Sequence, residues 1–452
     1  TDGIEYMLQA TEDLPVDVRF MLPSCVPATP LDESGANLDY RAIDSFYDHP
    51  RVQGLAEMMN SYGVIHGDAD VVSKIVASQA HHKKIDGHAP DLMGNELNAY
   101  VAAGVYSDHE CHDLNDAIAK LQRGQFIMIR EGTAARNLEA LTPLLCDKYV
   151  ERCMFCTDDK HPNDLLEKGH IDYIVKKAIS LGVEPITAIK AACHNAARYF
   201  LLNNRGAIAP GYLGDFVIID DFDHFNIEKV YKRGVLMCEN GVVTDFPVPE
   251  VDPYLVNRAH DTFHVAKLTA DDFIDNRPHA VIGMVNGEIT TTDCGYTDRI
   301  DVDYDILKIA VIERHKNTHH IGLGYIKGYG LKHGAVATSI SHDSHNIIVV
   351  GTNEADMAFA ANQVVSLNGG IVVAADDAVT GEVPLAVAGI MSDEPLVEVN
   401  RKLEQAKEKA FAAGVNRDID PFMTLSFMAL PVIPTLRITT RGVFDVTTQR
   451  YI

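Results

Sequence analysis

The chain has 452 residues, of which 46% are hydrophobic and 23% are charged, a balance typical of globular proteins rather than of disordered ones. A chain of this length builds a core without cross-links, which excludes a small disulfide scaffold. Asp and Glu number 64 against 39 Lys and Arg, a formal net charge of −25, so nucleic acid is not an expected partner.

The first part of the chain alternates short apolar runs with amphipathic segments. Strands are predicted over 18–22, 52–57, 84–88, 104–109, 126–130 and 153–158. Helices are predicted over 70–80, 114–123, 172–181 and 185–202. Strands that alternate with helices indicate a parallel sheet with crossover helices.

Polar side chains stand at the carboxyl ends of four of these strands. They are Glu57, His88, His109 and Asp158. A (β/α)8 barrel places its active site at this end of its strands, so the predicted fold class is α/β, a TIM-type barrel rather than an open sheet. Six strands are visible, and one or two more are expected upstream of Thr1.

The pattern changes after residue 205. A turn-rich stretch over 206–215 precedes the apolar run 216–219, and two further β-like runs end near Val243. Pro247, Pro249 and Pro253 mark a linker. Residues 255–452 are predicted as a separate α+β domain, with strands over 335–340, 347–351 and 371–375 and helices over 354–367 and 396–413.

The four strand-end residues are candidate metal ligands. Imidazole and carboxylate groups bind divalent metals of intermediate softness. Any one of the four also fits a hydrogen-bonded strand end, but four on successive strands favour a metal centre. Asp158 has a second candidate role, since a carboxylate beside a metal-activated water can accept its proton.

Two further charged residues lie beside these strand ends. Glu110 follows His109 and is a candidate for carrying a proton to a substrate nitrogen. The alternative is a solvated acidic residue at a helix N-terminus, where negative charge is favourable. Arg130 ends the fifth strand, just before Glu131, and either orients a ligand or pairs with a strand-end carboxylate.

The C-terminal block carries six polar residues in a row, 341–346, which read Ser-His-Asp-Ser-His-Asn. His342, Asp343 and His345 are potential ligands or proton carriers. The alternative is a polar turn whose side chains hydrogen-bond to one another.

Two other motifs are assigned to structure. Cys153-x-x-Cys156 lies inside a predicted strand without a second pair, so we place it in the core rather than at a zinc ion. Glycines at 322, 324, 328 and 330 lack the strand–turn–helix context of a dinucleotide loop and are assigned to a loop.

Several stretches together resemble the bacterial adenine deaminases, which belong to the amidohydrolase superfamily. The stretches are 23–28 (PSCVPA), 54–59 (GLAEMM), 86–90 (DGHAP), 96–100 (ELNAY), 128–137 (MIREGTAARN), 156–159 (CTDD), 169–172 (GHID), the turn 209–215, 341–346 (SHDSHN) and 430–434 (LPVIP). The resemblance covers nearly the whole chain, and the REGT and SHDSHN stretches distinguish it from other amidohydrolases.

This resemblance implies hydrolysis of adenine to hypoxanthine and ammonia on a metal-dependent hydrolase barrel. It implies a binuclear divalent metal centre with Mn²⁺ or Fe²⁺, and Zn²⁺ fits the same ligand types. Glu57 then resembles the carboxylate that bridges the two metals, and His88 and His109 resemble ligands of the second metal. Asp158 resembles the ligand of the first metal that is also the general base, and Glu110 or a nearby histidine would protonate a ring nitrogen.

The family supplies two further ligands as His-x-His at the end of the first barrel strand, and no His-x-His occurs in these 452 residues. That strand is therefore expected upstream of Thr1, together with the first strands of a small β-sandwich. A polypeptide with half of the ligands is expected to bind the first metal poorly.

Three domains are predicted on this basis. They are most of the catalytic barrel over 1–203, part of the β-sandwich over 204–248 and the C-terminal α+β domain over 255–452. The 341–346 loop is expected to reach the barrel mouth and to help bind substrate or close the site. His342 and His345 are accordingly assigned to catalysis, and Arg130, Glu131 and Asp343 to substrate binding.

The predicted function is metal-dependent deamination of adenine in purine salvage. No signal peptide is predicted over residues 1–5, and we expect a cytoplasmic homo-oligomer with a small purine substrate and no nucleic-acid or membrane partner. One alternative is an amidohydrolase that acts on another cyclic amidine or amide. The other is a truncated, non-catalytic binding module, which the missing His-x-His supports and the intact run of four ligand candidates opposes.

Overall fold

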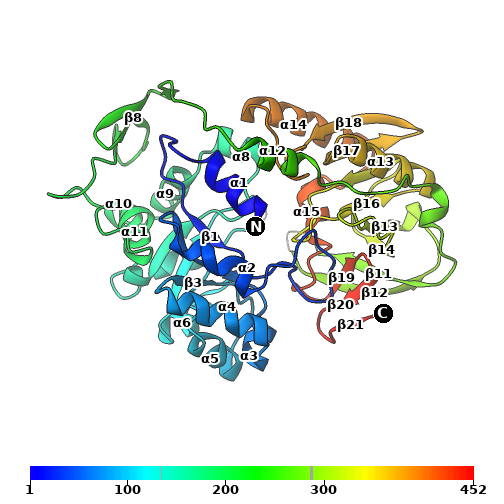
Figure 1. Ribbon diagram of the computed structural model, residues 1–452, viewed down its shortest axis with the longest axis horizontal. Helices are drawn as coiled ribbons and strands as arrows, with labels where there is room; N and C mark the ends of the chain where they lie inside the picture. Colours follow the sequence, from blue (N-terminus) through cyan, green and yellow to red (C-terminus); the bar gives the residue numbers. More distant parts are fainter. Residues whose placement is uncertain (134, 286–288) are drawn as a thin grey trace. The chain divides into compact units, whose positions relative to one another are not determined.

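The computed structural model describes residues 1–133, 135–285 and 289–452. Ala134, which belongs to the 128–137 stretch, lies outside the described residues. The chain forms two units, one of residues 1–24 and 38–252 and the other of residues 25–37 and 253–452 (Figure 1). Residues 25–37 thus leave the first unit after its first strand and belong to the second.

Six parallel strands follow one another through the first unit. They are β1 (Phe20–Leu22), β2 (Val52–Met58), β3 (Lys84–Gly87), β4 (Ser107–Asp108), β5 (Phe126–Arg130) and β6 (Cys153–Cys156). They pair as β1-β2-β3 and β4-β5-β6, and the Tyr106 amide donates to the Ile85 carbonyl at 2.9 Å between β3 and β4. All six predicted strands are confirmed, although β4 is shorter than predicted, and the α/β class is confirmed with them.

Helices precede, connect and follow these strands. They are α1 (Asp2–Ala10), α2 (Tyr40–Asp44), α3 (Ser61–His66), α4 (Ala69–Ala80), α5 (Gly94–Ala102), α6 (Leu114–Gln122), α7 (Leu138–Leu141), α8 (Pro162–Glu167), α9 (Ile171–Ser180), α10 (Pro185–Ile189) and α11 (Asn195–Tyr199). Asp68 and Asp113 cap α4 and α6 by accepting two backbone amides each, as expected at helix N-termini. None of the described helices combines the length and apolarity that a bilayer span needs.

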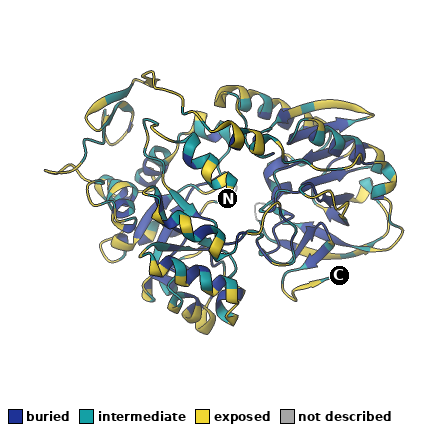
Figure 2. Ribbon diagram, viewed as in Figure 1, coloured by how far each residue is buried: buried dark blue, intermediate teal, exposed yellow. Residues whose placement is uncertain are grey.

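The core of the first unit holds the strand ends in place. Ile127, Ile129 and Phe155 of β5 and β6 pack in one cluster with Leu121 of α6 and Ile174 of α9. Figure 2 shows the parallel strands of this unit largely buried and the outer faces of the helices exposed. Neighbouring parallel strands end at the same edge of a sheet, so this packing brings their carboxyl ends together.

The core prediction for the cysteine pair agrees with the structure. Cys153 is buried and Cys156 is partly buried, both in β6. Neither belongs to a group of metal-type ligands among the residues that the structure describes.

A small antiparallel sheet completes the first unit. Its strands are β7 (Phe216–Ile219), β8 (Ile227–Lys232), β9 (Val235–Glu239) and β10 (Val242–Val243), in the order β10-β9-β8-β7. The predicted strand over 216–219 is confirmed. All residues of these four strands are half-buried or exposed.

The second unit is built on a mainly antiparallel sheet. Its strands are β11 (His279–Met284), β12 (Thr291–Thr297), β13 (Ile306–Ile312), β14 (Ile321–Lys327), β15 (Ala335–Thr338), β16 (Ile347–Gly351), β17 (Gly370–Ala375) and β18 (Ala378–Pro384). Their order is β12-β11-β14-β13-β16-β15-β17-β18, with β11 and β14 parallel. The three strands predicted for this block are confirmed.

Helices cover both faces of this sheet. Val336 and Val350 pack with the helix α14 (Leu396–Ala412), whereas Ala337 and Val349 pack with α13 (Glu354–Ser366). Successive strand residues point to opposite faces, so the two helices lie on opposite sides. The other elements of the second unit are α12 (Pro253–His260), α15 (Pro421–Phe427) and a sheet of β19 (Leu436–Thr439), β20 (Gly442–Asp445) and β21 (Arg450–Tyr451).

The loop prediction is wrong for Gly322 and Gly324, which lie in β14. A Cβ at Gly322 would come within 1.9 Å of the Thr439 carbonyl oxygen, so the close approach of β19 requires glycine here. Gly328 and Gly330 follow the strand with φ of +102° and +89°, as predicted for a loop.

Candidate metal centre

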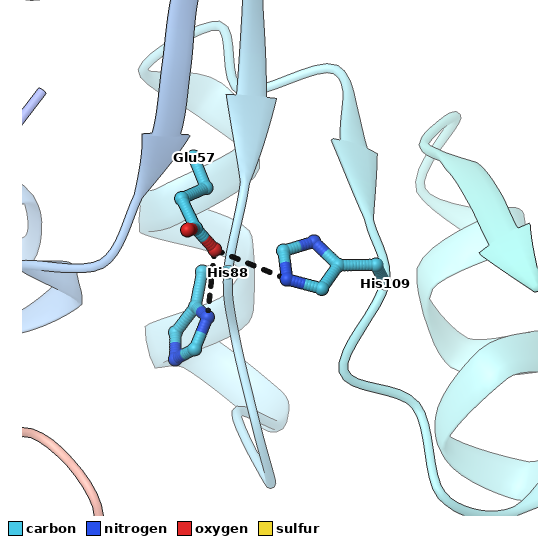
Figure 3. A group of neighbouring side chains, drawn as sticks. All are labelled: Glu57, His88 and His109. Carbon is cyan, nitrogen blue, oxygen red and sulfur yellow. Dashed lines mark hydrogen bonds and ion pairs between the residues drawn. The ribbon is translucent and has the colours of Figure 1, made fainter. Parts of the chain in front are cut away.

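Three of the predicted ligands meet at the carboxyl ends of β2, β3 and β4. The Glu57 Oε2 atom lies 3.2 Å from His88 Nδ1 and 3.1 Å from His109 Nε2. Figure 3 shows the carboxylate oxygen with one ring on either side, each ring coming from its own strand. The convergence follows from parallel pairing, since each residue stands at or just beyond the end of its strand.

Glu110 brings a second carboxylate to the same two rings. Its Oε1 atom lies 3.4 Å from His88 Nδ1 and 3.2 Å from His109 Nε2. Each of these two ring nitrogens therefore faces two carboxylates, those of Glu57 and Glu110.

Arg130 joins Glu110 to Asp158, the fourth predicted ligand. Its Nη1 donates to Glu110 Oε1 and to Asp158 Oδ2, both at 2.5 Å, and its Nη2 donates to Glu110 Oε2 at 2.9 Å. Of the two readings of Arg130, pairing with strand-end carboxylates is the one present in this geometry. The Asp158 side chain is 32% exposed and that of Glu110 only 7%, so Asp158 is the more accessible carboxylate.

The charges of this cluster reinforce one another. Desolvation favours the neutral carboxyl of Glu57, whose side chain is 41% exposed, but hydrogen bonds from His109 and His88 hold its pKa well below the usual value. Burial likewise opposes the charged imidazole, but Glu110 and Glu57 raise the pKa of His88 and raise that of His109 further. The carboxylates of Glu57 and Glu110 thus favour positive charge at the point that the two rings face.

Comparison with known proteins identifies the family. The amidohydrolase family model matches residues 1–237, and the adenine deaminase C-terminal domain model matches residues 286–450. The adenine deaminase of Desulfatibacillum aliphaticivorans is 44% identical over 459 residues, which are 98% of this chain and 79% of that relative. The chain belongs to the adenine deaminase family.

Further relatives agree with this assignment. The adenine deaminase of Kosmotoga olearia is 43% identical over 469 residues, covering 100% of this chain and 79% of that relative. A dihydroorotase of known structure aligns with 49% of this chain and 67% of its own, at 14% identity and a TM-score of 0.34, a likeness too slight to inform the assignment.

The residues present in this adenine deaminase family member fit a divalent metal. Ligand atoms of Glu57, His88 and His109 all lie within 4.8 Å of one another, and so do those of His109, Glu110 and Asp158. Imidazole nitrogen and carboxylate oxygen suit Mn²⁺, Fe²⁺ and Zn²⁺. His88 Nε2 is also buried and has no hydrogen-bond partner among the described residues, which leaves this ring nitrogen available to bind a metal.

The other predicted site residues have contacts of their own. The Glu131 carboxylate is buried and pairs with Lys177 of α9 at 3.1 Å. His342, Asp343 and His345 lie in the second unit, where His342 Nδ1 is 3.3 Å from Asp343 Oδ1 and the rings of His342 and His345 are 5.7 Å apart.

Two residues that support the cluster escaped the sequence reasoning. Asn137 donates to the carbonyls of His109 and Cys111 at 3.2 and 2.8 Å, and accepts from the Arg130 amide at 2.8 Å. Tyr100 accepts from the His88 amide at 2.9 Å. Both lie in stretches that carried the family resemblance, 128–137 and 96–100, which is the signal that could have identified them.

Proposed function

We propose that this chain hydrolyses adenine to hypoxanthine and ammonia. The observation that carries the proposal is the pair of imidazoles facing two carboxylates at parallel strand ends, in a chain 44% identical to adenine deaminases. A (β/α)8 barrel is the proposed setting, with residues 1–203 as most of it, 204–248 as part of a β-sandwich and 255–452 as the C-terminal domain.

The proposed metal ligands are Glu57, His88, His109 and Asp158, in a binuclear centre of Mn²⁺ or Fe²⁺. When bound, divalent metals lower the pKa of water, so that it becomes a nucleophile at neutral pH. The approach of the Glu57 carboxylate to both imidazoles supports its holding a metal together with His88 and His109, and its proposed bridging role rests on the family resemblance.

Asp158 is the proposed general base. It accepts a proton from the attacking water and delivers it to the amino group that leaves adenine as ammonia. Its partial exposure supports this role, because a group that exchanges protons with substrate has to be reached by it. The Arg130 hydrogen bond fixes one carboxylate oxygen, and the Asp159 amide donates to the other at 2.8 Å.

Glu110 is the second proposed proton carrier, acting on a ring nitrogen of adenine. Both of its oxygens accept hydrogen bonds from Arg130, and its side chain is buried. These contacts favour the ionised form, so Glu110 would first accept a proton and then pass it to the ring nitrogen. Loss of turnover in Glu110→Gln with metal binding retained would support this role.

The 341–346 loop is proposed to take part in substrate binding or closure, through His342, Asp343 and His345. Burial, with His342 and Arg314 nearby, lowers the pKa of His345 well below its usual value. A neutral imidazole both donates and accepts hydrogen bonds, which suits a neutral heterocycle such as adenine. Arg130 and Glu131 are the substrate-binding candidates of the first unit.

The acidic balance, a net charge of −25, supports a cytoplasmic enzyme that binds neither nucleic acid nor anionic membranes. A homo-oligomer is proposed as its assembly, and light scattering after size exclusion measures the mass in solution.

The activity is tested by incubating the purified chain with Mn²⁺ and following the loss of adenine by ultraviolet absorbance, with a chelator as control. Conversion to hypoxanthine that the chelator abolishes supports the proposal. Turnover of another cyclic amidine but not adenine would favour the first alternative, and failure to retain any metal would favour a binding module.

A further inference from the structure

A fully buried ion cluster lies directly behind the two histidines. Lys120 of α6 places its Nζ 2.9 Å from Asp108 Oδ2 and 2.9 Å from Asp116 Oδ2, and the side chains of Lys120 and Asp108 are completely buried. The same amine donates to the Ala89 carbonyl at 2.7 Å. Asp108, Cys111 and Asp116 have the chemistry of metal ligands, but the Lys120 amine already supplies the cation there.

The contacts of this cluster lead to the residues beside both imidazole ligands. Asp108 immediately precedes His109, and its Oδ2 accepts from the Glu110 amide at 3.1 Å. Its Oδ1 accepts from the amide of Ala89, which follows His88, at 2.8 Å. One carboxylate therefore holds the backbone next to both histidines, and Lys120 holds that carboxylate.

Stability alone does not account for such a cluster. Burying a lysine and two carboxylates costs desolvation, and buried ion clusters in other proteins have been replaced by apolar residues without loss of stability. Their best-attested benefit is to fix one arrangement among several. Partners behind metal ligands do the same for the ligand rings.

We infer that Lys120, acting through Asp108 and the Ala89 carbonyl, sets the relative position of His88 and His109. Lys120 is a positioning residue, because it contacts neither imidazole in the described structure. The inference rests on the proposed function, in which the two rings bind metal.

The chain offers two matched controls. Asp116 bonds Lys120 at the same 2.9 Å as Asp108 does, but among the described residues it accepts no backbone amide from either histidine loop. Lys308 is a buried lysine of the second unit that donates to the Phe273 carbonyl at 2.9 Å and to Glu354 at 2.5 Å.

The test compares Lys120→Met and Asp108→Asn with Asp116→Asn and Lys308→Met, all in the full chain. Mn²⁺ affinity is measured from the signal of free Mn²⁺ in electron paramagnetic resonance. Hydrogen exchange of the Ala89 and Glu110 amides is measured without metal. We expect the first two variants to raise the Kd for Mn²⁺ by about 10- to 100-fold and to exchange both amides faster, whereas the controls lose thermal stability without a change in Kd.

The inference is overturned if folded Lys120→Met and Asp108→Asn bind Mn²⁺ as wild type does, or if Asp116→Asn weakens binding equally. If Lys120→Met does not fold, Asp108→Asn decides, because asparagine keeps the size of the side chain but its amide nitrogen cannot accept from Lys120 or from the Glu110 amide. Wild-type protein that binds no Mn²⁺ would instead overturn the proposed function. Exchange at Ala89 and Glu110 would then still test whether Lys120 holds the two loops.

Discussion

In the first unit two carboxylates face the same two imidazole nitrogens, whereas in the second unit polar side chains of the 341–346 loop have separate partners. Glu57 and Glu110 lie 3.1 to 3.4 Å from the nitrogens of His88 and His109. In the loop, Ser344 donates to Asp32, and Asn346 Nδ2 donates to the Glu33 carbonyl at 2.7 Å.

The electrostatic consequences of the two arrangements are opposite. The pKa of His109 lies well above its usual value, because Glu110 and Glu57 outweigh burial. The pKa of His345 lies well below, because burial acts there together with His342 and Arg314. Both regions are rich in polar residues in the sequence. Among the described residues, the first brings ligand-type atoms of three side chains within 4.8 Å of one another, whereas the 341–346 loop does not.

The largest effect is expected from a substitution of Glu57, the carboxylate that faces both imidazoles. Glu57→Gln removes the charge that both imidazoles face, so Mn²⁺ should no longer be retained and kcat for adenine should fall by about 10⁴-fold or more. Metal content by plasma emission spectroscopy and kcat measure the two effects. Glu313→Gln removes a buried carboxylate of the second unit that accepts backbone amides, and it should keep its metal; equal loss in both variants would contradict the assignment.

A second variant separates proton transfer from metal retention. Asp158→Asn keeps the shape of the side chain but cannot accept a proton, so kcat should fall by about 10²- to 10⁴-fold. The metal held by Glu57, His88 and His109 should remain bound, whether or not the metal that Asp158 would bind is lost. Steady-state rates on metal-loaded protein check this, and a wild-type kcat in the variant would remove Asp158 from the role of base.

The second unit should respond to pH through Asp32. Burial raises the pKa of Asp32 to about 6, although Ser344 and the Glu33 amide donate to its carboxylate. An unfolded aspartate titrates near 3.9, so the folded state binds the proton more tightly. The resulting stability, about 3 kcal/mol, is fully present below pH ~4 and is lost as the pH rises through about 6.

Asp32→Asn cannot ionise and should therefore lose this pH dependence. Hydrogen exchange of the β13 and β16 amides, followed from pH 4 to 8, reports the stability of the second unit. A wild-type protein whose second unit gains stability over that range would contradict the expected sign.

The smallest effects are expected in the loop itself. His342→Ala and His345→Ala each remove one potential hydrogen bond to substrate, so KM for adenine should rise by about 2- to 10-fold. Initial rates over a range of adenine concentrations measure KM and kcat. If both variants leave kcat and KM unchanged, the loop has no part in binding or closing the site.

The positions of the strands and of the polar residues at their ends could be predicted from the sequence. Apolar runs ended at Glu57, His88, His109 and Asp158, and parallel pairing then brought the ends of these strands together. Asn137 donates to the His109 carbonyl 28 residues away, and Lys120 donates to the Ala89 carbonyl 31 residues away. No periodicity reveals such pairs.

Gly322 and Gly324 of β14 are a second case in which a contact with a distant part of the chain could not be predicted from the sequence. Gly322 is tolerated in a strand because the Thr439 carbonyl approaches it closely, a contact with a distant part of the chain. Arg130 was open to two interpretations in sequence, and its pairing with Glu110 and Asp158 became visible only in the folded structure.

The most direct test of the central claim is the anomalous scattering of crystals grown with Mn²⁺, recorded on either side of the manganese absorption edge. We expect a manganese peak between Glu57, His88 and His109. A peak at the exposed Asp220, Asp221 and His224 group with none at the strand ends would contradict it.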